Sequence, residues 1–76
     1  MIRVNLSLHF STARLARLRE EMGLTQEQAA RRAGMPGRAR WNDIESGRRM
    51  NITLEILDAI AGALGVSAAE LLVRGK

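Results

Sequence analysis

The chain of 76 residues is long enough for one small domain with a thin hydrophobic core. It has no cysteine and one histidine, His9, which excludes disulfide bridges and argues against a zinc finger or other metal cluster. No apolar run approaches the roughly 20 residues of a membrane helix, and the N-terminal residues do not resemble a signal peptide. We therefore expect a cytoplasmic protein without cofactor, metal or membrane contact.

The positive charge of the chain is concentrated in one segment. The net charge is +4, and residues 31–49 hold six arginines against two carboxylates, whereas the flanking segments are nearly neutral. A local excess of arginine indicates a polyanionic partner. A solvated charged surface has the same composition, so the charge alone does not decide between these interpretations.

Residues 2–10 alternate strictly between apolar and polar side chains, which predicts a β-strand arm over residues 1–10. Because no second strand pattern is visible and a lone strand cannot satisfy its own backbone groups, we expect this strand to pair with its copy in a twofold homodimer. The alternative is an arm packed irregularly on its own domain. The apolar positions of the predicted dimer contact are Ile2, Val4, Leu6, Leu8 and Phe10.

Capping residues and glycines divide residues 11–73 into five predicted helices, so the expected fold is all-α with an N-terminal strand. The predicted N-caps are Ser11, Thr25, Thr53 and Ser67, and the predicted stops are Gly23, Gly34, Gly47 and Gly65. The third helix is predicted over about 38–46 and the fifth over about 68–73. Residues 74–76 are expected to be a frayed tail.

Two charged residues are predicted to point toward the core. Arg19 lies on the apolar stripe of the first helix, and Glu45 shares a face of the third helix with Trp41 and Ile44. An inward arginine needs a partner, and Glu45 can provide it. Trp41 is interpreted as a core residue rather than a base-stacking one because of its spacing to Ile44.

The second and third predicted helices and the short glycine-containing turn between them form a helix-turn-helix unit. Over about residues 14–72 the sequence resembles the phage repressor/Cro-like helix-turn-helix family, also called the XRE family. The resemblance is carried by LREEMGLTQEQAA at 18–30, DIESGRR at 43–49, and ALGVS followed by ELL within 63–72. It implies a five-helix fold, an internal Arg19–Glu45 ion pair and double-stranded DNA as the partner, in a prokaryote or phage.

The resemblance also implies which residues would contact the DNA backbone. Gln26 and the N-cap Thr25 would contact a phosphate, helped by the backbone N–H groups at the start of that helix. Arg48 and Arg49, in the loop after the third helix, would contact further phosphates. Such contacts set register and affinity without reading sequence.

The third helix would lie in the major groove, where base edges present distinct donors and acceptors. Its expected outer face consists of Ala39, Asn42, Asp43 and Ser46, flanked near the N-terminal end by Arg38 and Arg40. Arg38 or Arg40 would bind guanine, and Asn42 would pair with adenine. Asp43 would either accept a hydrogen bond from cytosine or hold Arg40 within the helix.

These features predict a sequence-specific transcription regulator: a repressor, a controller protein or an antitoxin-like autoregulator. As a homodimer it would read palindromic half-sites about one helical turn apart. One alternative is a protein-interaction module on the same fold, and another is a ribbon-helix-helix arrangement in which the polar residues of 3–9 read bases. An enzyme is disfavoured because the sequence offers no nucleophile–base set and no glycine-rich phosphate loop.

Overall fold

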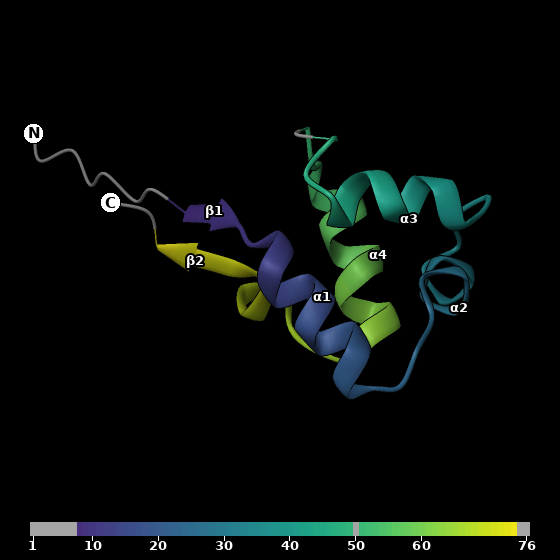
Figure 1. Cartoon of the computed structure of the whole chain (residues 1–76). Helices are drawn as coiled ribbons and strands as arrows, with labels where there is room; N and C mark the ends of the chain where they lie inside the picture. The colour runs from purple at the N-terminus through teal and green to yellow at the C-terminus, as the bar shows by residue number, and fades with distance from the viewer. Residues whose placement is uncertain (1–7, 50, 75–76) are drawn as a thin grey trace, which may run out of the picture.

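The computed structural model describes residues 8–49 and 51–74. In chain order these residues form β1 (Leu8–Phe10), α1 (Thr12–Glu21), α2 (Gln26–Arg32), α3 (Arg38–Glu45), α4 (Leu54–Leu64), the 3-10 helix η1 (Ala68–Leu71) and β2 (Leu72–Arg74). Helices α1 and α4 occupy the middle of the molecule, with α2 and α3 on one side and the two strands on the other (Figure 1). No helix among the described residues is long and apolar enough to cross a membrane.

The helices begin where the sequence predicts. The side chains of Ser11, Thr25 and Thr53 each accept a hydrogen bond of 3.1 Å from the backbone N–H three residues later. At the start of α2, Gln28 Oε1 accepts in return from the Thr25 N–H at 2.9 Å, which completes a capping box. These bonds satisfy backbone donors that have no partner within the first turn of a helix.

The hydrophobic core lies where the four α-helices meet. Its largest fully buried side chains are Trp41, Leu15, Ile44, Ile60 and Leu71. On α2 the core positions are Ala29 and Ala30, both completely buried. Because these side chains are small, α2 lies close against both α3 and α4. The helix-turn-helix pair is therefore packed on the core through Ala29 and Ala30 of α2 and Trp41 and Ile44 of α3.

The prediction of a fifth helix over residues 68–73 is wrong for residues 72 and 73, which belong to a strand. Residues 68–71 form the 3-10 helix η1, and the backbone becomes extended at Leu72. The chain then continues as β2, so Arg74 belongs to a strand and not to a frayed tail. The apolar residues at the end of this segment fit a helical stripe and a strand equally well, and the three residues of β2 are too few to show an alternating pattern.

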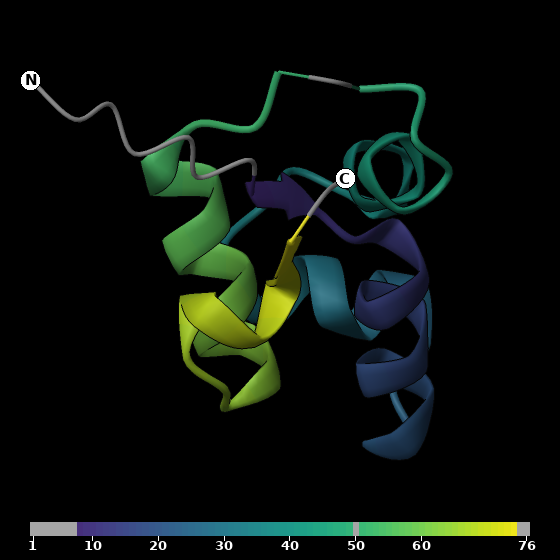
Figure 2. The same cartoon turned by 90° about the vertical axis from the view of Figure 1, so that its left-hand side faces the viewer.

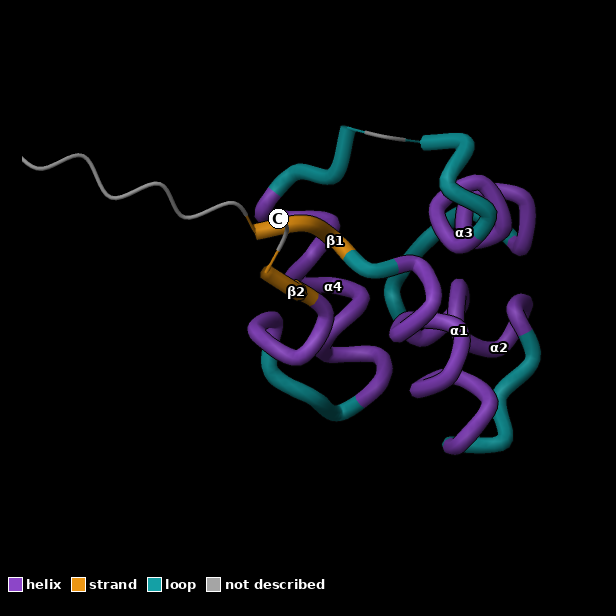
Figure 3. The backbone as a smooth tube through the Cα atoms, turned by 60° about the vertical axis from the view of Figure 1, so that its left-hand side comes forward, coloured by secondary structure: helices purple, strands orange, loops and turns teal. Residues whose placement is uncertain are grey.

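Strand β2 is the partner that β1 lacks in the sequence analysis. The two strands pair antiparallel, with Leu8 opposite Arg74 and Phe10 opposite Leu72, and they lie side by side in Figures 2 and 3. The prediction that the arm finds no partner within its own chain is therefore wrong for residues 8–10. Phe10 is half-buried and packs on the core of its own domain. Residues 1–7, which include three of the five positions predicted for dimer contact, lie outside the described residues.

Candidate nucleic-acid interface

The turn between α2 and α3 sets the angle of the helix-turn-helix unit. Gly34 adopts φ +74°, a left-handed conformation that glycine reaches without a Cβ penalty. The Met35 N–H then donates to the Ala30 carbonyl at 2.9 Å, which reverses the chain at the end of α2. After the extended Gly37, α3 begins at Arg38 and runs across α2, which Figure 1 shows nearly end-on.

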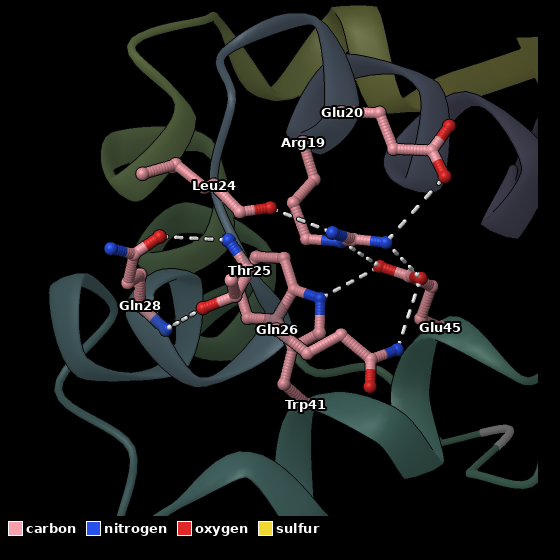
Figure 4. Close-up of polar contacts among 8 residues, drawn as sticks. All are labelled: Arg19, Glu20, Leu24, Thr25, Gln26, Gln28, Trp41 and Glu45. Atoms are coloured by element: carbon pink, nitrogen blue, oxygen red, sulfur yellow. Dashed lines mark hydrogen bonds and ion pairs between the residues drawn. The ribbon is translucent and has the colours of Figure 1, made fainter.

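The inner face of α3 is joined to α1 and α2 through one carboxylate, that of Glu45 (Figure 4). Arg19 Nε donates to Glu45 Oε1 at 2.8 Å and Arg19 Nη2 to Oε2 at 3.0 Å, a bidentate contact. Trp41 Nε1 donates to Oε1 at 2.8 Å, and Gln26 Nε2 donates to Oε2 at 3.1 Å. We call these four residues the Glu45 cluster. The predicted Arg19–Glu45 ion pair is thus formed, within a larger network.

The Glu45 cluster is sheltered from solvent and almost fully hydrogen-bonded. The side chains of Arg19 and Glu45 are 13% and 11% exposed, and Arg19 Nη1 also donates to the Leu24 carbonyl at 2.7 Å. Burial raises the pKa of the Glu45 carboxyl, but the hydrogen bonds from Arg19, Trp41 and Gln26 together outweigh burial and hold this pKa below its ordinary value. The hydrogen bond to Glu45 likewise raises the pKa of the Arg19 guanidinium. Both groups therefore stay charged at neutral pH.

The outer face of α3 has a different character. Arg38, Ala39 and Arg40 are exposed, and Asn42 and Asp43 are partly exposed. Neither Arg38 nor Arg40 has an ion-pair partner among the described residues. The predicted base-contacting residues are thus brought together on one side of one helix, and this side is basic.

The loop after α3 folds back onto Asp43. Gly47 has φ +81°, and the chain that follows places the Arg49 N–H 2.9 Å from the Asp43 carbonyl. Arg48 Nη1 lies 3.6 Å from Asp43 Oδ1. The ion-pair partner of Asp43 is therefore Arg48, so the structure does not support the alternative that Asp43 holds Arg40 within the helix.

The predicted phosphate-contacting residues lie at the start of α2 and in the loop after α3. Thr25 is occupied in the capping box, and the side-chain amide N–H of Gln26 donates to Glu45 Oε2. Arg48 is exposed, whereas Arg49 is partly buried, and its Nε has no hydrogen-bond partner among the described residues. The role of all four residues in phosphate binding remains a prediction.

Sequence reasoning missed two members of the Glu45 cluster. The spacing of Trp41 to Ile44 predicts only a core residue, although Trp41 precedes Glu45 by four positions and therefore lies beside it on the helix. Its complete burial agrees with that interpretation, and its indole N–H has a second, polar role. The contact of Gln26 with Glu45 joins two helices, and no spacing rule within one helix reveals it.

The chain matches a family model described as a helix-turn-helix domain over residues 12–72. It belongs to this family. The match extends from α1 into β2 and includes both the Glu45 cluster and the outer face of α3.

Individual relatives agree with this assignment. The chain is 48% identical over 56 residues to an uncharacterized HTH-type transcriptional regulator, y4dJ, of Sinorhizobium fredii, a match that spans 74% of this chain and 70% of the relative. Its fold is similar to the restriction-modification controller protein C.AhdI from Aeromonas hydrophila, with TM-score 0.73 and 35% identity over 79% of this chain and 88% of that one. It is also similar to the clp gene regulator ClgR from C. glutamicum, with TM-score 0.71 and 27% identity over 79% and 75% of the two chains.

These findings confirm the resemblance to Cro-like helix-turn-helix proteins. The protein is accordingly a member of a group of DNA-binding transcription regulators rather than of an enzyme family.

Proposed function

We propose that this protein is a sequence-specific regulator of transcription that reads the major groove of double-stranded DNA with α3. One observation carries the proposal: the inner face of α3 is fixed by the Glu45 cluster, while its outer face presents exposed arginines that form no ion pair with any residue that the structure describes. A rigid helix with a basic outer face has the form that the major groove accepts. The likeness to a controller protein and a gene regulator supports the role in transcription.

Base reading is assigned to the outer face of α3. Arg38 and Arg40 are exposed near its N-terminal end, which is the part of a recognition helix that reaches base edges. Each has the planar fork that matches O6 and N7 of guanine, and Asn42 has the amide that matches adenine. Ala39 is exposed between the two arginines, where a small side chain allows close approach of the helix to the bases.

Phosphate contacts are assigned to Arg48, Arg49 and the start of α2. Arg48 is exposed at the end of α3, where a flexible cation can reach the DNA backbone. Thr25 and Gln26 would contact a phosphate beside α2. For Gln26 this requires that its side-chain amide turns away from Glu45, to which its N–H donates. We expect these contacts to supply affinity on any sequence.

We further propose that the regulator acts as a homodimer on a palindromic site. Strands β1 and β2 pair with each other, so within the described residues each strand has one edge to which no strand is added. Such an edge is a template for a strand of a second copy. The residues that directly precede β1 continue its apolar alternation, with Ile2, Val4 and Leu6, which supports pairing on this side of the molecule.

Selection from a library of random DNA duplexes tests the function. The parent protein is expected to enrich one sequence pattern, and this pattern should be an inverted repeat if the protein is a dimer. Fluorescence anisotropy on the enriched duplex and on a shuffled one then measures preference, which should be accompanied by a steep loss of affinity with salt. Binding to neither duplex at low salt would refute the proposal and favour a protein-interaction module.

Matched variants locate the reading surface. Arg38→Ala or Arg40→Ala should reduce preference for the enriched duplex, by roughly 1–3 kcal/mol for a bidentate guanine contact. Arg17→Ala is the control, because Arg17 is an equally charged, exposed residue on α1. If all three substitutions change this preference equally, the arginines attract DNA only by their charge, and α3 does not recognise the base sequence.

A further inference from the structure

Asp43 is an acidic residue at the centre of a basic surface. It lies one turn after Ala39 and two residues after the buried Trp41, so it projects on the side of α3 opposite the core. Its side chain is 44% exposed. No other acidic residue lies on this outer face, which also carries Arg38 and Arg40.

Three contacts join Asp43 to the loop that follows α3. Its carbonyl oxygen accepts from the Arg49 N–H at 2.9 Å and from Ser46 Oγ at 3.3 Å. Its carboxylate faces Arg48 at 3.6 Å, and the Arg48 side chain is 75% exposed. The backbone contacts fix the loop independently of the carboxylate. The ion pair is long and solvated, so it opens at little cost when either partner finds a better one.

The chemistry of a carboxylate determines what DNA it tolerates. An ionised carboxylate only accepts hydrogen bonds. In the major groove the donors are the amino groups of cytosine and adenine, whereas guanine O6 and N7, thymine O4 and the phosphates all present negative potential. On most sequences an acidic group at this position therefore weakens binding, although the arginines around it strengthen binding on every sequence.

We propose that Asp43 determines selectivity by rejecting DNA that does not offer it a cytosine amino group. On a favourable site the Asp43 carboxylate accepts from cytosine N4, and Arg48, released from the ion pair, turns to a phosphate. With guanine or thymine at this position the carboxylate faces only acceptors, and with adenine it faces the N7 acceptor beside the amino group. This proposal rests on the proposed function, because it requires α3 to lie in the major groove.

The test compares the parent protein with Asp43→Asn in selection from random duplexes and in anisotropy titrations. The variant keeps the shape of the side chain but loses its charge and gains donors. We expect Asp43→Asn to bind shuffled DNA several-fold more tightly, and to lose the preference for cytosine at one position of each half-site. In the parent this preference should be roughly fivefold or more.

Two further variants separate selectivity from charge and from loop structure. Asp58→Asn makes the same charge change at an exposed residue of α4 that takes part in no ion pair among the described residues, so it should raise affinity for all duplexes equally. Arg48→Ala breaks the ion pair but leaves the carboxylate, so it should weaken binding to all duplexes and keep the cytosine preference. Thermal unfolding of each variant verifies that it is folded.

The outcomes distinguish this inference from the function on which it rests. If Asp43→Asn selects the same pattern as the parent and only binds more weakly, Asp43 is a structural support of the loop and the inference is wrong. Loss of the cytosine preference in Arg48→Ala would overturn it too. If the parent itself enriches no sequence, the proposed function fails, and the inference fails with it.

Discussion

The two faces of α3 differ in almost every physical respect, although they belong to the same eight residues. On the inner face, Trp41 and Ile44 are buried and Glu45 accepts hydrogen bonds from two other helices as well as from Trp41. On the outer face, Arg38 and Arg40 are exposed and form no ion pair among the described residues. The difference shows how one short helix separates stability from recognition: the inner face holds the helix still, and the outer face stays available to a ligand.

The largest effect on stability is expected for Glu45→Ala. This substitution leaves the mostly buried Arg19 side chain with only the more distant Glu20 carboxylate, at 3.8 Å, as an acidic neighbour, and it removes the acceptor of Trp41 and Gln26. Breaking a fully buried ion pair from one side costs about 3–5 kcal/mol. For this part-buried pair we expect a loss of up to that size, which urea unfolding followed by circular dichroism measures. Glu21→Ala, at an exposed glutamate of α1, is the control and should change the free energy of unfolding by less than about 0.5 kcal/mol. Similar losses in both variants would mean that the Glu45 cluster contributes no more to stability than an exposed glutamate does.

Trp41→Phe is expected to have the next largest effect. Phenylalanine keeps an aromatic ring in the core but lacks the indole N–H that donates to Glu45, and we expect a loss of about 1–3 kcal/mol in the free energy of unfolding. A double-mutant cycle with Glu45→Ala separates this hydrogen bond from lost packing. If the two substitutions are additive within about 0.5 kcal/mol, the bond between them contributes nothing measurable.

Lowering the pH should reduce the free energy of unfolding through protonation of Glu45, and Glu45→Gln should remove this part of the pH dependence. Because the pKa of Glu45 lies below its ordinary value in the folded protein, the unfolded chain binds more protons, and stability rises with pH. The contribution of Glu45 is complete above the pKa of an unfolded glutamate, about 4.3, and is lost as the pH falls from there through the lower pKa of the folded state. The difference in unfolding free energy between the parent and Glu45→Gln should therefore shrink on acidification. A difference that stays constant with pH would contradict the assigned pKa direction.

The smallest effect on stability is expected on the outer face. Arg40→Ala removes an exposed side chain without an ion-pair partner among the described residues, so the free energy of unfolding should change by less than about 0.5 kcal/mol. Urea unfolding and DNA titration of the same variant sharpen the comparison, because we expect the affinity for DNA to change while the free energy of unfolding does not. A loss of stability like that of Trp41→Phe would show that the outer face also supports the fold.

The sequence predicts the helical body well because local interactions define it. Ser11, Thr25 and Thr53 cap helices as expected, and each cap depends on a bond to a residue three positions away. The inward orientation of Arg19 and Glu45 follows from periodicity within each helix, and their contact follows from the need of a buried charge for a partner.

The features that the sequence does not reveal depend on contacts between distant segments. Strand β2 exists because β1 lies beside it, and the same three residues fit the end of a helix equally well. The Arg48–Asp43 contact depends on the path of the loop after Gly47, and the Gln26–Glu45 bond depends on the angle between α2 and α3. Periodicity within one segment contains no information on these angles.

The pairing of β1 with β2 has a consequence for how the molecule folds and opens. It joins Leu8 to Arg74, and closing so long a loop carries a higher entropic cost than the contacts between neighbouring helices. The helices are therefore expected to assemble first, and strands β1 and β2 are expected to pair last. In the native protein the pair of strands β1 and β2 can then separate as a local opening event, because it lies on the side of α1 and α4 away from α2 and α3 (Figure 1). Such openings would leave the helix-turn-helix unit intact.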